Sequence, residues 1–296
     1  MIREFLRRMR SLGDEVMGIN ARNVECIYPL NRRCHFPRAD DKLRTKEILA
    51  RAGVPTPPTL AEYRAFGDLA HLERDTENPE GFVVKPASSF GGQGIAVLRR
   101  APSGRFAAPG GAEWTPEDLR MHIVQILTGV FALERLSDKA FLEQLLEPEE
   151  VLGAISHRGL PDIRVIVHRG APLMCMVRAP TSASRGRANL HQGALGLGVD
   201  IATGRTNGAI LGGRRIETHP DNGRALGGIE IPRWPEVLDL ACRAAVCTEL
   251  GYVGVDVVID KRCGPMVIEL NARPGLAIQL ANGAGLMRRI REGGVR

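Results

Sequence analysis

The stretch GYVGVDVVIDKRCGPMVIELNARPG, residues 251–275, contains two apolar runs that flank a short polar turn. This pattern is typical of an antiparallel β-hairpin. If the turn closes symmetrically, Asp260 lies opposite Pro265, and stepping outward places Asp256 opposite Glu269. Two carboxylates at that cross-strand distance, roughly 5 Å, destabilise a sheet unless positive charge lies between them. The hairpin therefore points to something positive between the two acids.

Asn271 follows Glu269 by two residues, so its side chain shares the same face if the strand continues. Three oxygen ligands without His or Cys suit Mg²⁺, or Mn²⁺, rather than zinc. Such a metal completes its shell with water and phosphate oxygens. We therefore predict a metal site formed by Asp256, Glu269 and Asn271. The alternative is an edge hairpin with incidental solvated acids, and the apolar surroundings of both acids count against it.

A second pattern is VVKPASSFGGQGI, residues 83–95. Lys85 ends a predicted strand, and the Ser/Gly-rich run after it can present backbone N–H groups to phosphate oxygens. The run is not a Walker A loop, because no GK[ST] follows the glycines. A strand, rather than a helix, is expected after it, which also argues against a dinucleotide-binding fingerprint. We predict a strand–glycine loop–strand cover over phosphates.

Arginine and amide side chains form a third group. Arg164 and Arg178 interrupt apolar strands, where an unpaired guanidinium is costly. Arg187, Asn189 and Gln192 follow in the segment RGRANLHQG. Cations and amides gathered in this way are candidate site residues. Structural ion pairing is the alternative for each arginine.

The remaining pattern predicts an α+β protein of two lobes that are hinged near residue 145. Helices are expected at 41–52, 67–74, 115–128 and 235–250. Strands are expected at 82–84, 95–98, 141–146, 162–168 and 172–178, before the terminal hairpin. Residues 101–113 are expected to form a loop or hairpin, and residues 193–198 a glycine-rich stretch.

Composition narrows the functional class. The chain carries a formal charge of +6, yet aromatic residues make up only 4%, so we interpret the excess charge as suited to phosphates and small acids and expect no nucleic-acid partner. The chain contains no run of about 18 apolar residues, the length that a transmembrane helix needs, so we predict no transmembrane segment. The six cysteines include no CxxC pair, which favours a reduced, cytoplasmic protein. Apolar residues within 2–12 fall at helical spacing, which favours a docked helix over a membrane-surface one.

Taken together, these blocks resemble the ATP-grasp superfamily, in particular the alpha-L-glutamate ligase-like branch that includes the ribosomal-protein glutamate ligases. The resemblance covers nearly the whole chain. It rests on NARN at 20–23, DDKLRTK at 40–46, VVKPASSFGGQGI, PDIRVIV, RANLHQGALGLGVD, GYVGVDVV and VIELNARPGLAIQLANGAGL. It implies an ATP-grasp fold in which two α+β lobes close on ATP. The expected division is a short N-terminal segment at 1–40 (a helix plus an extended stretch) and an ATP-grasp domain at 41–296, with a lid lobe at about 80–145 and a metal-binding core lobe at about 146–290.

The resemblance also implies roles for individual residues. Those implied to contact ATP are Lys42, Lys85, Ser89, Gly91, Gly92, Gly94, Glu143, Gln144, Leu145, Leu146 and Arg187, with Glu150 or Glu147 at the ribose. Those implied to act in the reaction are Arg164, Arg178, Asn189 and Arg273, and the implied metal ligands are Asp256, Glu269 and Asn271. Two departures stand out, because relatives tend to have SDGKANLHQG where this chain has SRGRANLHQG. Arg185 thus replaces an acid, and Arg187 replaces a lysine, with which it is not interchangeable.

The activity implied is that of a carboxylate–amine ligase that uses ATP and Mg²⁺ and forms an amide through an acyl phosphate. Glutamate or another amino acid would be joined to a peptide or small acceptor. Two alternatives remain: an ATP-grasp enzyme with a glycan- or envelope-linked acceptor, and a nucleotide-binding regulator without catalysis. Ribosomal-protein glutamate ligases carry a larger N-terminal domain than the roughly 40 residues that precede Asp40. A homo-oligomer or a partner that completes the substrate site is therefore left open.

Overall fold

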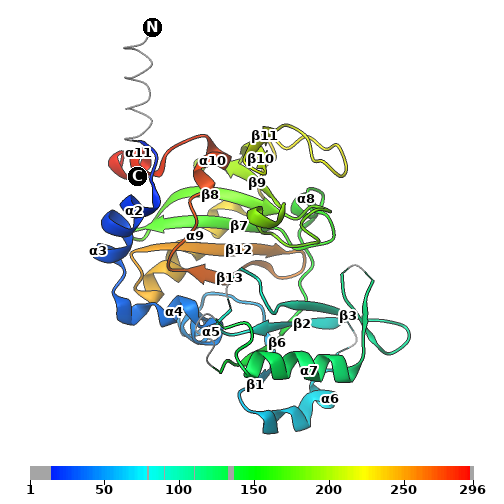
Figure 1. Ribbon diagram of the computed structural model, residues 1–296. Helices are drawn as coiled ribbons and strands as arrows, with labels where there is room; N and C mark the ends of the chain where they lie inside the picture. Colours follow the sequence, from blue (N-terminus) through cyan, green and yellow to red (C-terminus); the bar gives the residue numbers. More distant parts are fainter. Residues whose placement is uncertain (1–14, 79, 90, 110, 133–136, 294–296) are drawn as a thin grey trace.

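The computed structural model describes residues 15–78, 80–89, 91–109, 111–132 and 137–293. Two antiparallel sheets organise them (Figure 1). The larger sheet has the order β11-β10-β9-β8-β7-β12-β13. Its strands are β7 (Asp162–His168), β8 (Ala171–Ala179), β9 (Leu195–Val199), β10 (Thr206–Leu211), β11 (Arg214–Ile216), β12 (Tyr252–Asp260) and β13 (Gly264–Asn271).

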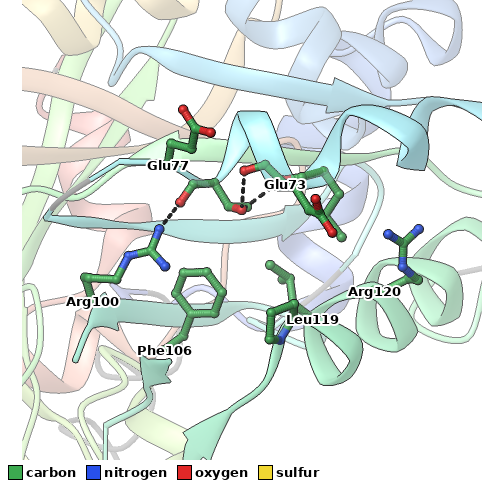
Figure 2. Close-up of a pocket in the computed structure, with 9 residues that line it drawn as sticks. Glu73, Glu77, Arg100, Phe106, Leu119 and Arg120 are labelled. Atoms are coloured by element: carbon green, nitrogen blue, oxygen red, sulfur yellow. Dashed lines mark hydrogen bonds between the residues drawn. The ribbon is translucent and has the colours of Figure 1, made fainter. Parts of the chain in front are cut away.

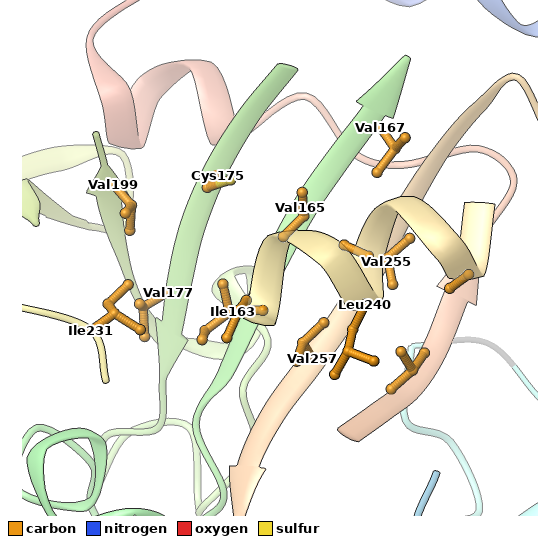
Figure 3. Close-up of a cluster of buried hydrophobic side chains, with 14 of the residues drawn as sticks. Ile163, Val165, Val167, Cys175, Val177, Val199, Ile231, Leu240, Val255 and Val257 are labelled. Atoms are coloured by element: carbon orange, nitrogen blue, oxygen red, sulfur yellow. The ribbon is translucent and has the colours of Figure 1, made fainter. Parts of the chain in front are cut away.

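Side-chain alternation divides the larger sheet into two faces. One face is a continuous apolar core with α9 (Trp234–Thr248), and Figure 3 shows Leu240 of that helix in one cluster with side chains from β7, β8 and β12. At one end of the other face, apolar side chains such as Ile166 and Met174 pack against the N-terminal helices, α10 (Ile278–Asn282) and α11 (Leu286–Arg291). Charged residues occupy the middle of this second face, and Val258 and Met266 pack with Leu146 beyond them.

A β-bulge in β13 determines which face Glu269 occupies. Val257 pairs with Val267, yet Asp256 pairs with Glu269, so Ile268 is an extra residue in β13. In a regular ladder Glu269 would fall opposite Val255 and face the apolar core, because a one-residue shift reverses every side chain. The bulge instead places Glu269 on the charged face.

The predicted pairing of Asp256 with Glu269 is confirmed, but the predicted turn is wrong. Asp260 pairs with Gly264 instead of Pro265. The tight turn suits Gly264, which has a φ of 83°. The bulge at Ile268 adds one residue to β13 and so compensates for the shorter turn. Asp256 therefore pairs with Glu269, as symmetric closure predicted, although the turn itself is not symmetric.

The smaller sheet has the order β1-β6-β2-β3-β4-β5 and is covered by α7 (Pro116–Leu127). Its strands are β1 (Thr59–Tyr63), β2 (Gly81–Pro86), β3 (Ala96–Arg100), β4 (Phe106–Ala107), β5 (Glu113–Trp114) and β6 (Ala140–Gln144). The short β4–β5 hairpin falls within the expected loop or hairpin at 101–113. β1 extends this sheet to residues before the expected lid boundary near 80, and β6 ends before Leu145 and Leu146.

Helix α5 (Lys42–Arg51) lies where the two sheets meet. The Asp41 side chain caps it by accepting hydrogen bonds from the backbone N–H groups of Leu43 and Arg44. Lys42 N donates to Ala87 O of the smaller lobe at 2.9 Å, while Val267 N of β13 donates to Pro55 O at 2.9 Å. This segment thus ties the glycine loop to the strand that carries Glu269. The other helix predictions are also confirmed, by α7, by α9, and by η3 (Phe66–His71) with α6 (Leu72–Asp75).

The N-terminal segment corrects one prediction. Residues 15–40 contain no strand and consist largely of short helices, where we expected an extended stretch after a helix. The elements are α2 (Ile19–Ala21), η1 (Arg22–Ile27), α3 (Tyr28–Leu30), η2 (Arg33–His35) and α4 (Pro37–Asp40). The predicted helix within 2–12 lies outside the described residues. Short helices α8 (Glu150–Gly153) and η4 (Leu190–Gln192) complete the described structure, in which no helix is long and apolar enough to cross a membrane.

Candidate functional site at the junction of the two lobes

A buried ion-pair network occupies the charged face of the larger sheet. Both oxygens of Asp256 accept from Arg164, with Nε–Oδ1 and Nη2–Oδ2 distances of 2.7 and 2.6 Å. Arg178 Nη2 donates to the same Oδ2 at 2.7 Å. Arg178 also binds both oxygens of Asp162, at 2.6 and 2.7 Å. β7, β8 and β12 contribute these residues because positions 162, 164, 178 and 256 all point away from the α9 core.

The network supplies the positive charge that the adjacent acids require. Sequence reasoning predicts a cation beside Asp256 and Glu269, and around Asp256 the described structure places two guanidinium groups. The Asp256 side chain is 0% exposed, and Asn271 Nδ2 lies 3.3 Å from its Oδ2. Glu269 is 34% exposed and has Lys42 Nζ at 3.7 Å. Arg164 and Arg178 are therefore ion-paired, as the structural alternative expected, and this pairing does not test a role in catalysis.

The pKa values reflect this sharing of charge. Burial and the nearby Asp256 raise the pKa of Asp162 to about 6, against the attraction of Arg178. For Asp256, burial is outweighed by Arg164 and Arg178, which hold its pKa below the usual value. The pKa of Arg178 is raised, because its acidic neighbours outweigh burial. At neutral pH the network consists of ionised groups, with each acid held by a guanidinium.

A small cavity of about 90 Å³ opens next to this network. Five predicted site residues line it, and they come from α5, the glycine loop and the β13 segment: Lys42, Ser89, Glu269, Asn271 and Arg273. Lys42 Nζ donates to Ser89 O at 2.9 Å. The Ser89 hydroxyl is buried and has no hydrogen-bond partner among the described residues. A polar atom left unpaired in this way is costly.

Arg273 reaches the rim of this cavity from the segment after β13. Its Nη2 contacts Asp40 Oδ2 at 3.0 Å, and its guanidinium lies 4.6 Å from the centroid of the Phe36 ring. The side chains of Arg273 and Asp40 are both partly exposed. Arg273 is thus held at the surface by one ion pair and one stacking contact, and it is more accessible than Arg164 and Arg178.

A second charged cluster lies at the predicted hinge. Glu143 of β6 is buried and contacts the ammonium groups of both Lys85 and Lys46. The Lys46 Nζ–Glu143 Oε1 distance is 2.6 Å. Burial alone would raise the pKa of Glu143, but the two lysines outweigh it, so its pKa lies below the usual value. Lys85 therefore faces Glu143 in this structure, and among the described residues it does not line the small cavity.

The other hinge residues divide between core and surface. Leu145 and Leu146 are buried, and Gln144 N donates to Pro58 O at 3.0 Å. Glu150 lies on the surface in α8, where its Oε1 contacts Lys261 Nζ at 3.0 Å. Glu147 accepts the backbone N–H of Lys261 through its own backbone oxygen. Among the described residues, neither Glu150 nor Glu147 lines the small cavity.

The glycine loop between β2 and β3 has the conformation that its glycines permit. Gly91, Gly92 and Gly94 have φ values of 65°, 78° and 72°, a region that other residues rarely adopt. A Cβ atom on Gly94 would lie 2.7 Å from atoms of Phe131 and Pro86. Gly91 and Gly92 have open space around the same position. The loop therefore combines one packed glycine with two that face open space.

The loop between β8 and β9 is held by its own hydrogen bonds. Asn189 Oδ1 accepts from His191 N at 3.0 Å and caps η4, and Arg187 Nη1 contacts Gln192 Oε1 at 3.3 Å. Asp221 anchors the start of the loop through Ser182. In the described structure neither Arg187 nor Asn189 lines the small cavity. Their predicted roles toward phosphate or substrate stay predictions.

The larger cavity, about 200 Å³, lies in the smaller lobe and contains no predicted site residue. Figure 2 shows it between α6 and α7, with Phe106 and Leu119 along an apolar wall and Glu73, Glu77 and Arg120 around it. Arg100 crosses the cavity to bind the backbone oxygen of Thr76 and stacks on Phe106. The Arg100 guanidinium is thus already paired, so the smaller cavity is the better candidate site.

The donors beside the small cavity suit a hard divalent cation in part. Glu269 and Asn271 line the cavity, and carboxylate and amide oxygens are ligands that Mg²⁺ accepts. Asp256 lies behind them with both oxygens engaged by arginines. It can act as a ligand only if an arginine contact yields. No cluster of three His, Cys, Asp or Glu side chains suited to a metal occurs in the described ranges.

Sequence reasoning missed three charged residues of this region: Asp40, Lys46 and Asp162. The period-two pattern of β7 places Asp162 on the same face as Arg164, so that residue was open to prediction. Lys46 follows Lys42 by one helical turn, which offers a weaker signal. The contact between Asp40 and Arg273 joins residues far apart in the chain, and no local pattern predicts it.

Comparison with known proteins agrees with this architecture. The family model described as sugar-transfer associated ATP-grasp matches residues 21–293. A ribosomal protein bS6–L-glutamate ligase of Salmonella paratyphi B is 28% identical over 255 residues, which is 84% of this chain and 61% of that protein. A probable alpha-L-glutamate ligase of Maridesulfovibrio salexigens is 25% identical over 253 residues, with the same two shares. The chain thus spans about three fifths of the length of these relatives.

A solved structure supports the fold. The biotin carboxylase of Campylobacter jejuni, in a complex with an ATP analogue, superposes with a TM-score of 0.53 at 16% identity. The match covers 87% of this chain and 46% of that one. Because the family model spans nearly all of the described structure, the two-lobed chain belongs to the ATP-grasp superfamily, within the family described as sugar-transfer associated ATP-grasp.

Proposed function

We propose that the chain is an ATP- and Mg²⁺-dependent ligase that joins a carboxylate to an amine. The observation that carries this proposal is the small cavity where Lys42, Ser89, Glu269, Asn271 and Arg273 meet between the two lobes. Its lining combines positive charge for phosphates with oxygen donors for a divalent metal. The ligase names of the curated relatives support the reaction class, although the chain spans 61% of their length.

The reaction we propose has two steps. A substrate carboxylate oxygen attacks the γ-phosphorus of ATP, which forms an acyl phosphate and releases ADP. An amine then attacks the acyl carbon, loses a proton and displaces inorganic phosphate, which leaves an amide. Neither step needs a nucleophile from the protein, so the protein acts by positioning the reactants and neutralising charge.

The site residues divide this work in our proposal. Lys42 and Lys85 bind phosphate oxygens, and Arg273, the accessible arginine at the rim, faces the reacting carboxylate or the transferred phosphoryl group. The loop with Gly91, Gly92 and Gly94 covers the phosphates and excludes water, which would hydrolyse an acyl phosphate. Arg164 and Arg178 keep Asp256 ionised beneath the cavity.

Glu269 and Asn271 would hold a magnesium ion at the cavity wall, joined by Asp256 once an arginine yields. The bound ion would supply positive charge beside the phosphate groups. We propose contacts to nucleotide for the hinge residues Glu143 to Leu146, for Glu150 or Glu147 at the ribose, and for Arg187, and contacts to substrate for Asn189.

An acceptor linked to a sugar is the second candidate, because the matching family model is described as sugar-transfer associated. An amino acid or peptide acceptor is supported instead by the names of the glutamate-ligase relatives. The carboxylate chemistry is shared, and the two candidates differ in the group that supplies the amine.

Both candidates can be tested with one assay. The purified chain is incubated with ATP, Mg²⁺ and a pool of amino acids, alone or with a pool of amino sugars, and ADP release and new amide masses are measured. Amides between two amino acids support the first candidate, and amides to amino sugars support the second. Tight ATP binding without substrate-dependent ADP release in any pool would overturn the ligase proposal and favour a nucleotide-binding regulator.

A further inference from the structure

Glu143 is a buried carboxylate that two lysines share. One oxygen contacts Lys46 Nζ at 2.6 Å and the other contacts Lys85 Nζ. The Glu143 side chain is 4% exposed, and those of Lys46 and Lys85 are 15% and 13% exposed. The cluster therefore carries one negative and two positive charges with little access to water, so one positive charge lacks a carboxylate partner within it.

The two lysines are held differently. The Lys46 ammonium also donates to Pro57 O at 2.5 Å and lies 5.5 Å from the centroid of the Phe141 ring. Within the described parts of the chain, Glu143 is the sole hydrogen-bond partner of the Lys85 ammonium. Lys46 of α5 is thus fixed by three contacts, one from the segment before β1 and two from β6, while Lys85 is held by one.

The difference between the two lysines affects how easily Lys85 can leave Glu143 and turn toward a phosphate group. If Lys85 were the only partner of Glu143, its departure would leave a buried carboxylate unpaired. Breaking a buried pair in this way is strongly unfavourable, because the charge that stays behind has neither water nor a partner. With Lys46 in place, Glu143 keeps a charged partner after Lys85 moves.

We propose that Lys46 is a positioning residue that holds Glu143 and thereby frees Lys85 to bind the phosphates of a nucleotide. The proposal rests on the proposed function, since it takes Lys85 to be a phosphate ligand. Lys46 itself does not touch the nucleotide. Its effect on binding should therefore depend on the charge of Glu143, which gives the proposal a specific signature.

The experiment measures dissociation constants of a non-hydrolysable ATP analogue and of adenosine by calorimetry. The variants are Lys46→Met, Glu143→Gln, the double variant Lys46→Met/Glu143→Gln, and Lys85→Met. Arg64→Met is the matched control, because it removes one positive charge from an exposed ion pair with Glu62 near the same sheet. Melting temperatures report on the fold of each variant.

We expect Lys46→Met to weaken binding of the ATP analogue at least about tenfold, while adenosine binding changes less than about threefold. In the Glu143→Gln background, the same change should have less than about a threefold effect, because a neutral glutamine at position 143 no longer retains Lys85. The Arg64→Met variant should bind like the wild type. If Lys46→Met does not fold, the comparison of the double variant with Glu143→Gln still tests the proposal.

Two results would overturn the inference. An unchanged affinity of Lys46→Met shows that Lys85 is released without help. An equal loss in both backgrounds shows that Lys46 acts independently of Glu143, through direct contact or general packing. Failure of the proposed function is distinguishable, because then the wild type itself does not bind the ATP analogue or Lys85→Met binds it as tightly as the wild type.

Discussion

Two acids that sequence reasoning treats as equivalent metal ligands differ in their surroundings. Asp256 is fully buried and holds two guanidinium groups, whereas Glu269 is 34% exposed at the cavity. The Asp256→Asn variant leaves both arginines short of a buried partner, and we expect it to lower the free energy of unfolding by about 3–5 kcal/mol. Denaturant unfolding of this variant measures the change. A loss below about 1 kcal/mol would contradict the role of Asp256 as the anchor of the network.

For Glu269 we expect a small effect on stability and a large effect on activity. Its contact with Lys42 is long and partly solvated, so we expect Glu269→Gln to change the free energy of unfolding by less than about 1 kcal/mol. Substrate-dependent ADP release should nevertheless fall by about 10²-fold or more, because the cavity wall loses a carboxylate that would hold the metal. Glu292→Gln, at an exposed pair with Arg288, is the control and should change neither quantity. Wild-type turnover in Glu269→Gln would remove this residue from the site.

At the scale of single elements, Gly92 and Gly94 of the glycine loop differ in why a glycine is needed. Gly92 has an unusual backbone conformation only, whereas Gly94 has a similar conformation and also close neighbours. Gly92→Ala places an alanine at a φ of 78° in open space, which costs about 1–2 kcal/mol of backbone strain. Gly94→Ala adds contacts of 2.7 Å with Phe131 and Pro86 to a similar strain. We expect Gly94→Ala to be the more destabilising by about 1 kcal/mol or more in thermal unfolding. Equal losses would mean that the loop relaxes at no cost.

Strand β6 carries a prediction about acid stability. The folded-state pKa of Glu143 is depressed below its ordinary value of 4.5. A carboxylate of this kind contributes stability that is fully present above its unfolded-state pKa and is lost as pH falls through the folded-state pKa. The difference in unfolding free energy between wild type and Glu143→Gln should therefore be largest near neutral pH and shrink below pH 4.5. A difference independent of pH would contradict the charged state of Glu143.

Elements with a clear local signal were predictable, and those shaped by tertiary contact were not. The apolar runs of β7 and β12, and the Thr115 cap of α7, are local signals that the structure confirms. β9 was expected only as a glycine-rich stretch. Its Gly198 is required because a Cβ there would lie 2.5 Å from the backbone oxygen of Ala281 in α10. No local pattern contains that contact.

The candidate site likewise combines features that local sequence patterns predict with features that depend on tertiary contacts. Symmetric closure of the turn predicted the pairing of Asp256 with Glu269, but in the structure this pairing depends on the bulge at Ile268, which no local pattern predicts. Residue types also identified Lys85, Arg164 and Arg178 as chemically informative, and the family resemblance added Lys42. Their partners depend on how β7, β8 and β12 adjoin in the sheet, so the ion pairs of Arg164 and Arg178 became visible only in the structure.

At the scale of the whole molecule, the small cavity draws its lining from both lobes. Ser89 belongs to the glycine loop of the smaller lobe, and Glu269 and Asn271 belong to the larger sheet. A nucleotide bound there should stabilise the two lobes together. We expect a non-hydrolysable ATP analogue with Mg²⁺, at about 100 times its dissociation constant, to add about 2.7 kcal/mol to the unfolding free energy. Thermal unfolding in a single, upward-shifted transition would agree with this, and an unshifted transition would contradict it.

The most direct test of the ligase proposal is to trap the activated carboxylate. Hydroxylamine replaces the natural amine, so the assay needs no knowledge of the acceptor. The chain is incubated with ATP, Mg²⁺, hydroxylamine and pooled amino acids, and hydroxamates and ADP are quantified beside the Glu269→Gln variant. We predict hydroxamate and ADP in equal amounts, dependent on a carboxylate and lost in the variant. ADP release that needs no carboxylate, or nucleotide binding with no hydroxamate from any pool, would contradict carboxylate activation.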